Sequence, residues 1–206
     1  MQIRPNAFTI GLIIYSFMAL FLVYTEFGID SYGFEIIIST LVGFFIVFLI
    51  GICCGELLLA ILFYALFVGV RLSAGGYHAS SHLKCKLLLC ACCLSTLLTT
   101  IFFEDYYNLK VQTIIIIFYL LTIFLFSPIE HPNAPLDYFT MKRNRGISII
   151  VSFILALVIM LGYFEFKKLA MVSSMTLLVV ALLMLLSKYT ERRKSNEKRY
   201  QETPYS

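Results

Sequence analysis

Long apolar segments alternate with short polar stretches along the whole chain. Most of them approach the roughly 20 residues with which a helix crosses a bilayer, and they lack the alternation of a membrane barrel strand. Only helices and closed barrels satisfy every backbone amide in lipid. The pattern therefore predicts an all-α, polytopic membrane bundle with apolar segments at 8–24, 34–54, 57–70, 87–103, 111–127, 147–164 and 169–187.

Composition supports a membrane location. The 206 residues are 60% hydrophobic and 14% charged, whereas about a quarter of the residues in an ordinary soluble domain are charged. No small-residue cleavage site follows segment 8–24, so we interpret it as a retained first span. We expect residues 1–187 to form a single membrane domain and 188–206 to form a basic cytoplasmic tail. A nucleic-acid partner is not expected.

Charges in the loops predict the orientation, because short cytoplasmic loops are enriched in Lys and Arg. The tail contains six basic residues and is expected inside. Counting spans backwards from it places loop 128–146 inside, loop 104–110 outside and the polar stretch 71–86 inside. Loop 165–168 is an exception, since it contains two lysines and is predicted to lie outside.

The same count suggests that one apolar segment does not cross. If the N-terminus with Arg4 is cytoplasmic, loop 26–33 lies outside and the stretch from Phe34 to Val70 crosses an odd number of times. Segment 57–70 is short for a span, so the prediction is about six transmembrane helices plus one re-entrant or interfacial segment. That segment leads directly into the polar stretch at the cytoplasmic edge of the membrane.

The polar stretch RLSAGGYHASSHLKC, residues 71–85, contains the parts of a nucleophilic site. Cys85 lies between two lysines and shares the stretch with Arg71, and positive charge nearby favours the reactive thiolate. His78 and His82 supply a base near neutral pH. Together they suggest a Cys-His site in which an imidazole accepts the thiol proton and later protonates a leaving amine.

Spacing does not choose between the two histidines. On a straight helix His82 would contact Cys85, three residues on, whereas His78 would lie about 10 Å away along the axis. Gly75 and Gly76 suit a tight turn, however, and a turn would bring His78 back towards the thiol. Both histidines therefore remain candidates at this point.

Other interpretations of these polar residues also remain. The His-His-Cys spacing could ligate zinc, although a fourth ligand is not evident, and the stretch could simply anchor at lipid headgroups.

Glu56, between two apolar segments, could orient His78 or bind substrate, or could mark the end of a span. Glu130 and His131 could contact substrate, but a solvated turn between prolines explains them as well. No metal or cofactor is expected.

The motif resembles the signature of the AgrB family (accessory gene regulator protein B). The resemblance extends over nearly the whole chain and includes a proline-rich loop, SPIEHPNAPL, at residues 127–136. The spacing R-x-x-A-G-G-x-H-A-x-x-x-x-x-C is carried by Arg71, Ala74, Gly75, Gly76, His78, Ala79 and Cys85.

The resemblance implies an integral membrane cysteine endopeptidase of Gram-positive bacteria. Such proteins process a precursor peptide of the AgrD type into a cyclic quorum-sensing pheromone. It implies that Cys85 is the nucleophile and His78 the catalytic histidine, with Arg71, Gly75 and Gly76 in support, and it ranks His82 as the alternative base. Expected partners are the precursor and the bilayer, and a homodimer is left open. The competing class is a non-enzymatic transporter or peptide export partner, which would be favoured by an internal repeat.

Overall fold

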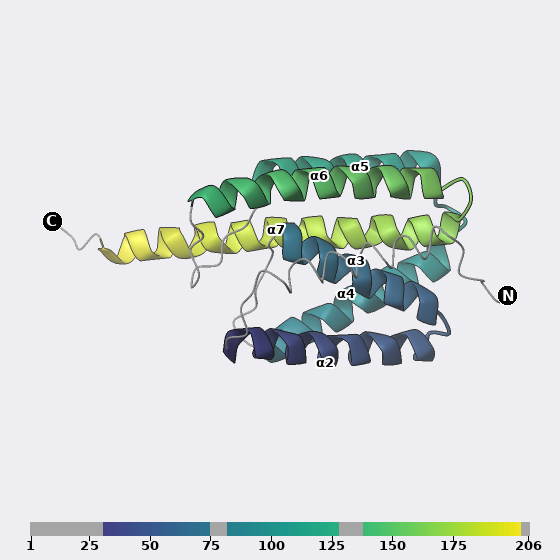
Figure 1. The fold of residues 1–206 in the computed structure, drawn as a ribbon, viewed down its shortest axis with the longest axis horizontal. Helices are drawn as coiled ribbons and strands as arrows, with labels where there is room; N and C mark the ends of the chain where they lie inside the picture. The colour runs from purple at the N-terminus through teal and green to yellow at the C-terminus, as the bar shows by residue number, and fades with distance from the viewer. Residues whose placement is uncertain (1–30, 75–81, 128–137, 203–206) are drawn as a thin grey trace.

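Helices make up all the regular structure in the residues that the computed structural model describes, namely 31–74, 82–127 and 138–202 (Figure 1). The all-α prediction is confirmed for these ranges, and every predicted apolar segment after the first coincides with one helix. Segment 8–24 lies outside the described residues. The helices are α2 (Ser31–Cys53), α3 (Leu57–Ala74), α4 (His82–Phe103), α5 (Leu109–Phe126), α6 (Tyr138–Gly162) and α7 (Lys167–Glu202).

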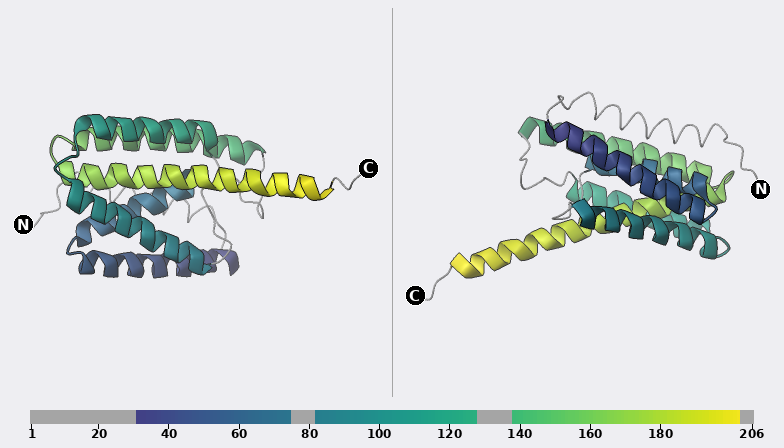
Figure 2. Two further views of the ribbon diagram at one scale, coloured as in Figure 1. Left: turned by 180° about the vertical axis from the view of Figure 1, so that it is seen from behind. Right: turned by 90° about the horizontal axis from the view of Figure 1, so that it is seen from below.

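The longest helix, α7, is the centre of the bundle. It packs against α3, α4, α5 and α6. Helices α5 and α6 lie side by side along one flank of α7, and α3 and α4 cross its other flank obliquely (Figures 1 and 2). Helix α2 packs outside α3 and α4. The consequence is that α3 and α7 contribute most of the buried core.

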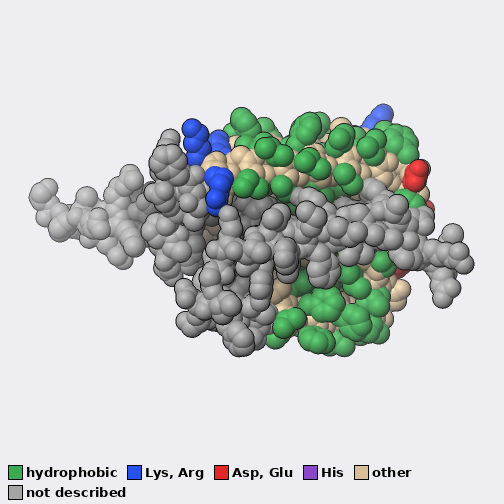
Figure 3. Space-filling view, in the orientation of Figure 1, with side chains coloured by type: hydrophobic (Ala, Val, Ile, Leu, Met, Phe, Trp, Pro, Cys, Tyr) green, Lys and Arg blue, Asp and Glu red, His purple; other side chains and the backbone are tan. Residues whose placement is uncertain are grey.

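Apolar side chains are found both inside and outside the bundle. Leu59, Leu62 and Phe63 of α3 are fully buried, whereas Phe45 of α2 and Phe153 of α6 are 62% and 63% exposed. Hydrophobic side chains cover the visible surface of α5 and α6 (Figure 3). Continuous apolar surface of this extent is unusual in a soluble monomer, and it matches a bundle that contacts lipid.

Four stretches in the described residues are long and apolar enough to cross a membrane: Cys85–Phe103, Leu109–Phe126, Lys142–Gly162 and Lys167–Thr190. Two shorter apolar stretches, Ser39–Cys53 and Leu57–Arg71, belong to α2 and α3. These are the features of a helical membrane protein, while the expected total of six spans is not confirmed.

Helices α2 and α3 form an antiparallel hairpin with a glycine-dependent turn. The amide of Glu56 donates to the carbonyl of Gly51 at 2.9 Å, and the amide of Gly55 donates to that of Ile52 at 3.1 Å. These two bonds define a Schellman cap, whose C′ residue adopts the left-handed conformation. Gly55 occupies that position with φ of 70°, which a residue with a Cβ would adopt only at a cost of about 1–2 kcal/mol.

The hairpin leaves the predicted re-entrant or interfacial segment a prediction, because the apolar part of α3, Leu57–Arg71, is not one of the four stretches long and apolar enough to cross a membrane. Because α2 runs to the turn and α3 returns, Ser31 and Ala74 lie at the same end of the bundle (Figure 1). Helix α3 continues through Arg71 to Ala74, so its 18 residues extend about 27 Å, although its apolar part ends at Arg71.

Charged side chains lie at the two ends of the bundle, which we name the basic end and the hairpin end. The basic end is where α3 finishes and α4 and α6 begin, and Lys142, Arg143 and Arg145 are exposed there (Figure 3). The hairpin end carries the α2–α3 turn and the loops 104–108 and 163–166, which contain acidic residues, and lysines follow in the first turns of α5 and α7. This asymmetry agrees with the loop charges on which the orientation was predicted.

Several polar side chains between the helices pair with one another or with backbone carbonyls, whereas the Thr96 hydroxyl and the Gln112 Oε1 have no hydrogen-bond partner among the described residues. The hydroxyls of Tyr119 and Ser152 are 2.8 Å apart across α5 and α6, and the side-chain amide of Gln112 donates to the carbonyl of Ile159 at 2.9 Å. Tyr64 of α3 donates to the carbonyl of Thr40 in α2. Such bonds are needed because the hydrocarbon offers no competing partner.

Close packing in the hairpin yields a first prediction. A Cβ added at Gly51 would lie 2.7 Å from the Cβ of Ala60, so Gly51→Ala should lower the free energy of unfolding by about 1–3 kcal/mol through overpacking. Gly146 of α6 has nothing within 4 Å of such a Cβ, and Gly146→Ala should raise stability by about 0.5–1 kcal/mol. Unfolding in mixed micelles measures both; equal stability of the two variants would contradict the tight hairpin.

Candidate functional site

Two residues of the predicted site meet at the basic end. Arg71 belongs to the last turn of α3 and Cys85 to the first turn of α4. A guanidinium N–H of Arg71 donates to the Cys85 Sγ at 3.9 Å, and both residues are half-buried. The contact joins a cation and a thiol that are 14 residues apart in sequence.

Packing within α3 positions the guanidinium. The Cζ of Arg71 lies 5.7 Å from the centre of the Phe67 ring, a distance at which the ring face attracts a cation. Phe67 is 3% exposed and stacks on Phe63, with 5.4 Å between ring centres. The charged group is therefore held by the buried aromatic residues one and two turns before it.

A second basic side chain fixes the start of α4. The Nζ of Lys86 donates to the carbonyl of Ser39 in α2 at 3.4 Å. Cys85 thus begins a helix that is attached to α3 through Arg71 and to α2 through Lys86. The positive end of the α4 dipole and the guanidinium both raise the electrostatic potential at the sulfur, which is the environment that a nucleophilic thiol needs.

The remaining motif residues are only partly described. Gly75, Gly76 and His78 lie outside the described residues, and so do Glu130 and His131. His82 is the first residue of α4, three residues before Cys85, and its side chain is not described. The choice between His78 and His82 as the base therefore stays a prediction.

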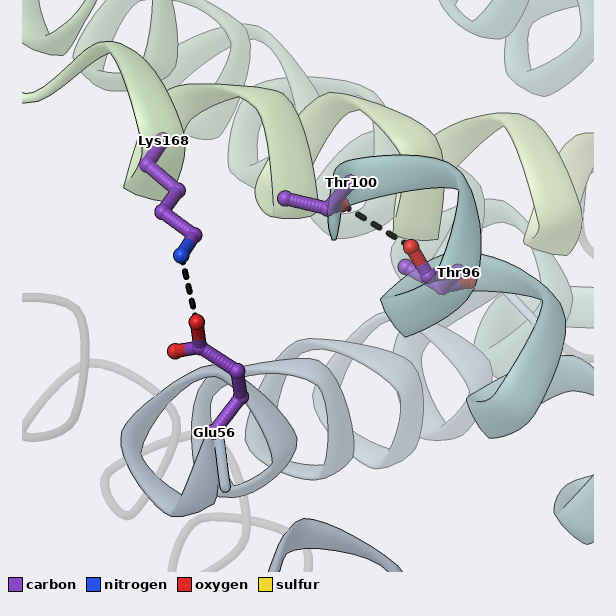
Figure 4. A network of polar contacts seen from close by, with 4 residues as sticks. All are labelled: Glu56, Thr96, Thr100 and Lys168. Atoms are coloured by element: carbon purple, nitrogen blue, oxygen red, sulfur yellow. Dashed lines mark hydrogen bonds and ion pairs between the residues drawn. The ribbon is translucent and has the colours of Figure 1, made fainter. Parts of the chain in front are cut away.

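Glu56 lies at the opposite end of the bundle from Cys85. It directly precedes α3, whereas Arg71 is in the last turn, so about 22 Å of helix separate the two residues. Its carboxylate forms an ion pair with the Nζ of Lys168, at the start of α7 (Figure 4). The structure does not bring Glu56 to the thiol, and it gives the carboxylate a partner that joins α3 to α7.

This ion pair accounts for one of the two lysines that make loop 165–168 an exception among the loop charges. Lys168 is one of the two lysines in the loop predicted to lie outside, and its charge is compensated by Glu56. Sequence reasoning missed the pair because its residues are 112 positions apart. The sequence could have indicated the pair only through residue type and position, since Glu56 and Lys168 are oppositely charged residues and each lies at the edge of an apolar segment.

The threonines in the same close-up are part of α4. The hydroxyl of Thr100 donates to the carbonyl of Thr96 at 2.9 Å (Figure 4), and both residues are at most 2% exposed. A bond of this kind satisfies a buried hydroxyl within its own helix. We assign these residues to the packing of α4 against α7.

Fold and site together define a class: a helical membrane protein that holds a thiol beside a guanidinium at the basic end of its bundle. The chain belongs to the AgrB family, because the family model described as Accessory gene regulator B matches residues 25–191. That match includes Arg71, Cys85 and all the helices except the end of α7.

Curated relatives agree with the family assignment. An AgrB-like protein of Listeria welshimeri is 28% identical over 175 residues, and one of Listeria monocytogenes serovar 1/2a is 28% identical over 179 residues. An AgrB-like protein of Listeria innocua is 28% identical over 173 residues. Each alignment covers 83% of this chain and 83% of the relative. No solved structure gives a significant match.

The contact between Arg71 and Cys85 yields a second prediction. In Arg71→Gln the positive charge beside the sulfur is lost, so alkylation of Cys85 by iodoacetamide should slow by about 3–10-fold, which corresponds to roughly 1 kcal/mol of lost charge stabilisation. Peptide mass spectrometry gives the rate at each cysteine, and Cys53, exposed at the other end, is the internal control.

A matched variant tests whether the effect is local. Lys168→Gln removes a cation at the hairpin end and should leave the alkylation rate of Cys85 unchanged. If Arg71→Gln and Lys168→Gln slow the alkylation of Cys85 equally, or if neither variant slows it, the guanidinium has no specific effect on the thiol.

Proposed function

We propose that this chain is a membrane cysteine endopeptidase that cleaves a precursor peptide of the AgrD type and closes the released segment into a ring. The observation that supports this most directly is the Arg71 guanidinium beside the Cys85 sulfur, within the region matched by the family model. The AgrB family is known for processing the peptide of a quorum-sensing system.

In the first step the sulfur of Cys85 attacks the carbonyl carbon of the scissile peptide bond. The thiol proton passes to His78, which then protonates the departing nitrogen as the carbon–nitrogen bond breaks. The C-terminal fragment leaves with a free amine, and the pheromone segment remains on Cys85 as a thioester. Arg71 stabilises the negative charge on the sulfur before the attack and helps to orient it.

In the second step the thioester is transferred within the bound peptide. A thiol of the peptide attacks the thioester carbonyl, a new carbon–sulfur bond forms, and the bond to the Cys85 sulfur breaks. The proton given up by the peptide thiol returns to Cys85 through the histidine. The product is a cyclic thiolactone; a hydroxyl in place of the peptide thiol would give a lactone.

The location of the thiol favours transfer over hydrolysis. Cys85 lies at the start of a helix that is apolar over its next several turns, and a site that the bound precursor closes there would exclude the water that hydrolyses an acyl-enzyme. Exchange between two thioesters changes the free energy little, whereas making a thioester from an amide is unfavourable. Removal of the product therefore drives the overall reaction forward.

The basic end is assigned to the cytoplasm of a Gram-positive cell. Arg71, Lys86, Lys142, Arg143 and Arg145 all lie at that end, and such residues are enriched in cytoplasmic loops. The precursor would then be cleaved on the side of the membrane where it is synthesised. The Gram-positive setting rests on the family.

An acyl-enzyme is the third prediction. Wild-type protein in lipid vesicles, incubated with its cognate precursor, should gain the mass of the N-terminal precursor fragment on Cys85. The adduct should be lost in Cys85→Ala and His78→Ala and should persist in His82→Ala. Intact mass spectrometry measures the adduct, and peptide mapping locates it.

Other outcomes separate the alternatives. Loss of the adduct in His82→Ala with retention in His78→Ala would assign the base to His82. Absence of both adduct and cleavage with a genuine precursor would contradict the peptidase and favour the transporter or export partner.

A further inference from the structure

A shallow apolar groove of about 360 Å³ runs between α5 and α6. Ile117, Leu121 and Phe124 line it from α5, and Ile149 and Phe153 line it from α6. None of these residues belongs to α3 or α4, which carry the guanidinium and the thiol of the candidate site. The groove is therefore separate from the proposed catalytic site and independent of the proposed function.

The groove opens to the surface that contacts lipid. Ile117, Leu121, Phe124 and Phe153 are between 55% and 63% exposed, and the visible surface of α5 and α6 is covered with hydrophobic side chains (Figure 3). A concave, wholly apolar surface at this position suits a hydrocarbon chain.

Two cations continue the groove at the basic end. On α6 the positions 142, 145, 149 and 153 follow helical spacing and lie on one face, so Lys142 and Arg145 stand in line with Ile149 and Phe153. A guanidinium N–H of Arg145 donates to the carbonyl of Phe124 at 3.3 Å, and Phe124 lines the groove. Both Lys142 and Arg145 are exposed.

We propose that this groove and its two cations bind an anionic phospholipid, with an acyl chain between α5 and α6 and the phosphate headgroup at Lys142 and Arg145. Charge complementarity selects this occupant, because basic pockets between helices bind anionic headgroups. A second copy paired through the same face about a two-fold axis fits less well. The second copy would bring its own Lys142 and Arg145 close to the Lys142 and Arg145 of the first, and these like charges would repel.

The sequence offers a clean way to test the site, because it contains no Trp. Phe153→Trp places a single indole in the groove, where lipids with brominated chains quench its fluorescence on contact. Phe45→Trp is the matched control, since Phe45 is 62% exposed against 63% for Phe153 and lies near the middle of α2.

The experiment compares brominated phosphatidylglycerol with brominated phosphatidylcholine, each titrated into phosphatidylcholine vesicles that contain the full chain. The indole of Phe153→Trp should be quenched at lower mole fractions of the anionic lipid, with about a fivefold preference for each basic residue that contacts the headgroup. The indole of Phe45→Trp should show no such preference. Adding Lys142→Gln and Arg145→Gln to Phe153→Trp should abolish the preference, whereas adding Lys142→Arg should preserve it.

Three results would overturn the proposal. These are equal quenching of the Phe153→Trp indole by both lipids, the same anionic preference in Phe45→Trp, and a preference that survives the loss of both cations. The first would mean ordinary contact with bulk lipid, the second a general attraction of anionic lipid to the protein, and the third recognition without Lys142 and Arg145.

Discussion

Hydrocarbon provides no hydrogen-bond partner, and this constraint determines where the chain can place polar and reactive side chains. Most polar groups within the described part of the bundle pair with each other, as Tyr119 does with Ser152, or with backbone carbonyls, as Ser173 does with Leu169, or they lie at the ends. A half-buried thiol with a charged neighbour is therefore favoured only where helices begin and finish. The contact between Arg71, in the last turn of α3, and Cys85, in the first turn of α4, meets this condition.

Helix α3 links the two ends of the bundle. At the hairpin end Glu56 joins it to α7 through Lys168, and the close approach of Gly51 to Ala60 joins it to α2. Along its length Leu59, Leu62 and Phe63 are fully buried. A guanidinium carried at the other end of so constrained a helix has a well-defined position, as its proposed role beside the Cys85 sulfur requires.

Sequence predicted the helices well because lipid exposure leaves long apolar runs that are easy to recognise. The number of crossings stays a prediction, since loop charges report only the parity of crossings and the apolar part of α3, Leu57–Arg71, is shorter than the four candidate spans. The motif placed Arg71 and Cys85 in one site, and the structure brings them together. No local spacing could reveal the pairing of Glu56 with Lys168. The roles of His78 and His82 remain predictions, because the chain between α3 and α4 lies outside the described residues.

The central claim is that the Cys85 sulfur is the nucleophile that cleaves the precursor. Replacing that single sulfur atom with oxygen, in Cys85→Ser, tests it. Precursor cleavage in lipid vesicles would be followed over time for wild type, Cys85→Ser and Cys90→Ser. Cys90 lies on the same helix, five residues further into the apolar part. The account predicts that Cys85→Ser abolishes cleavage while Cys90→Ser cleaves at the wild-type rate. Cleavage by Cys85→Ser at the wild-type rate would contradict it.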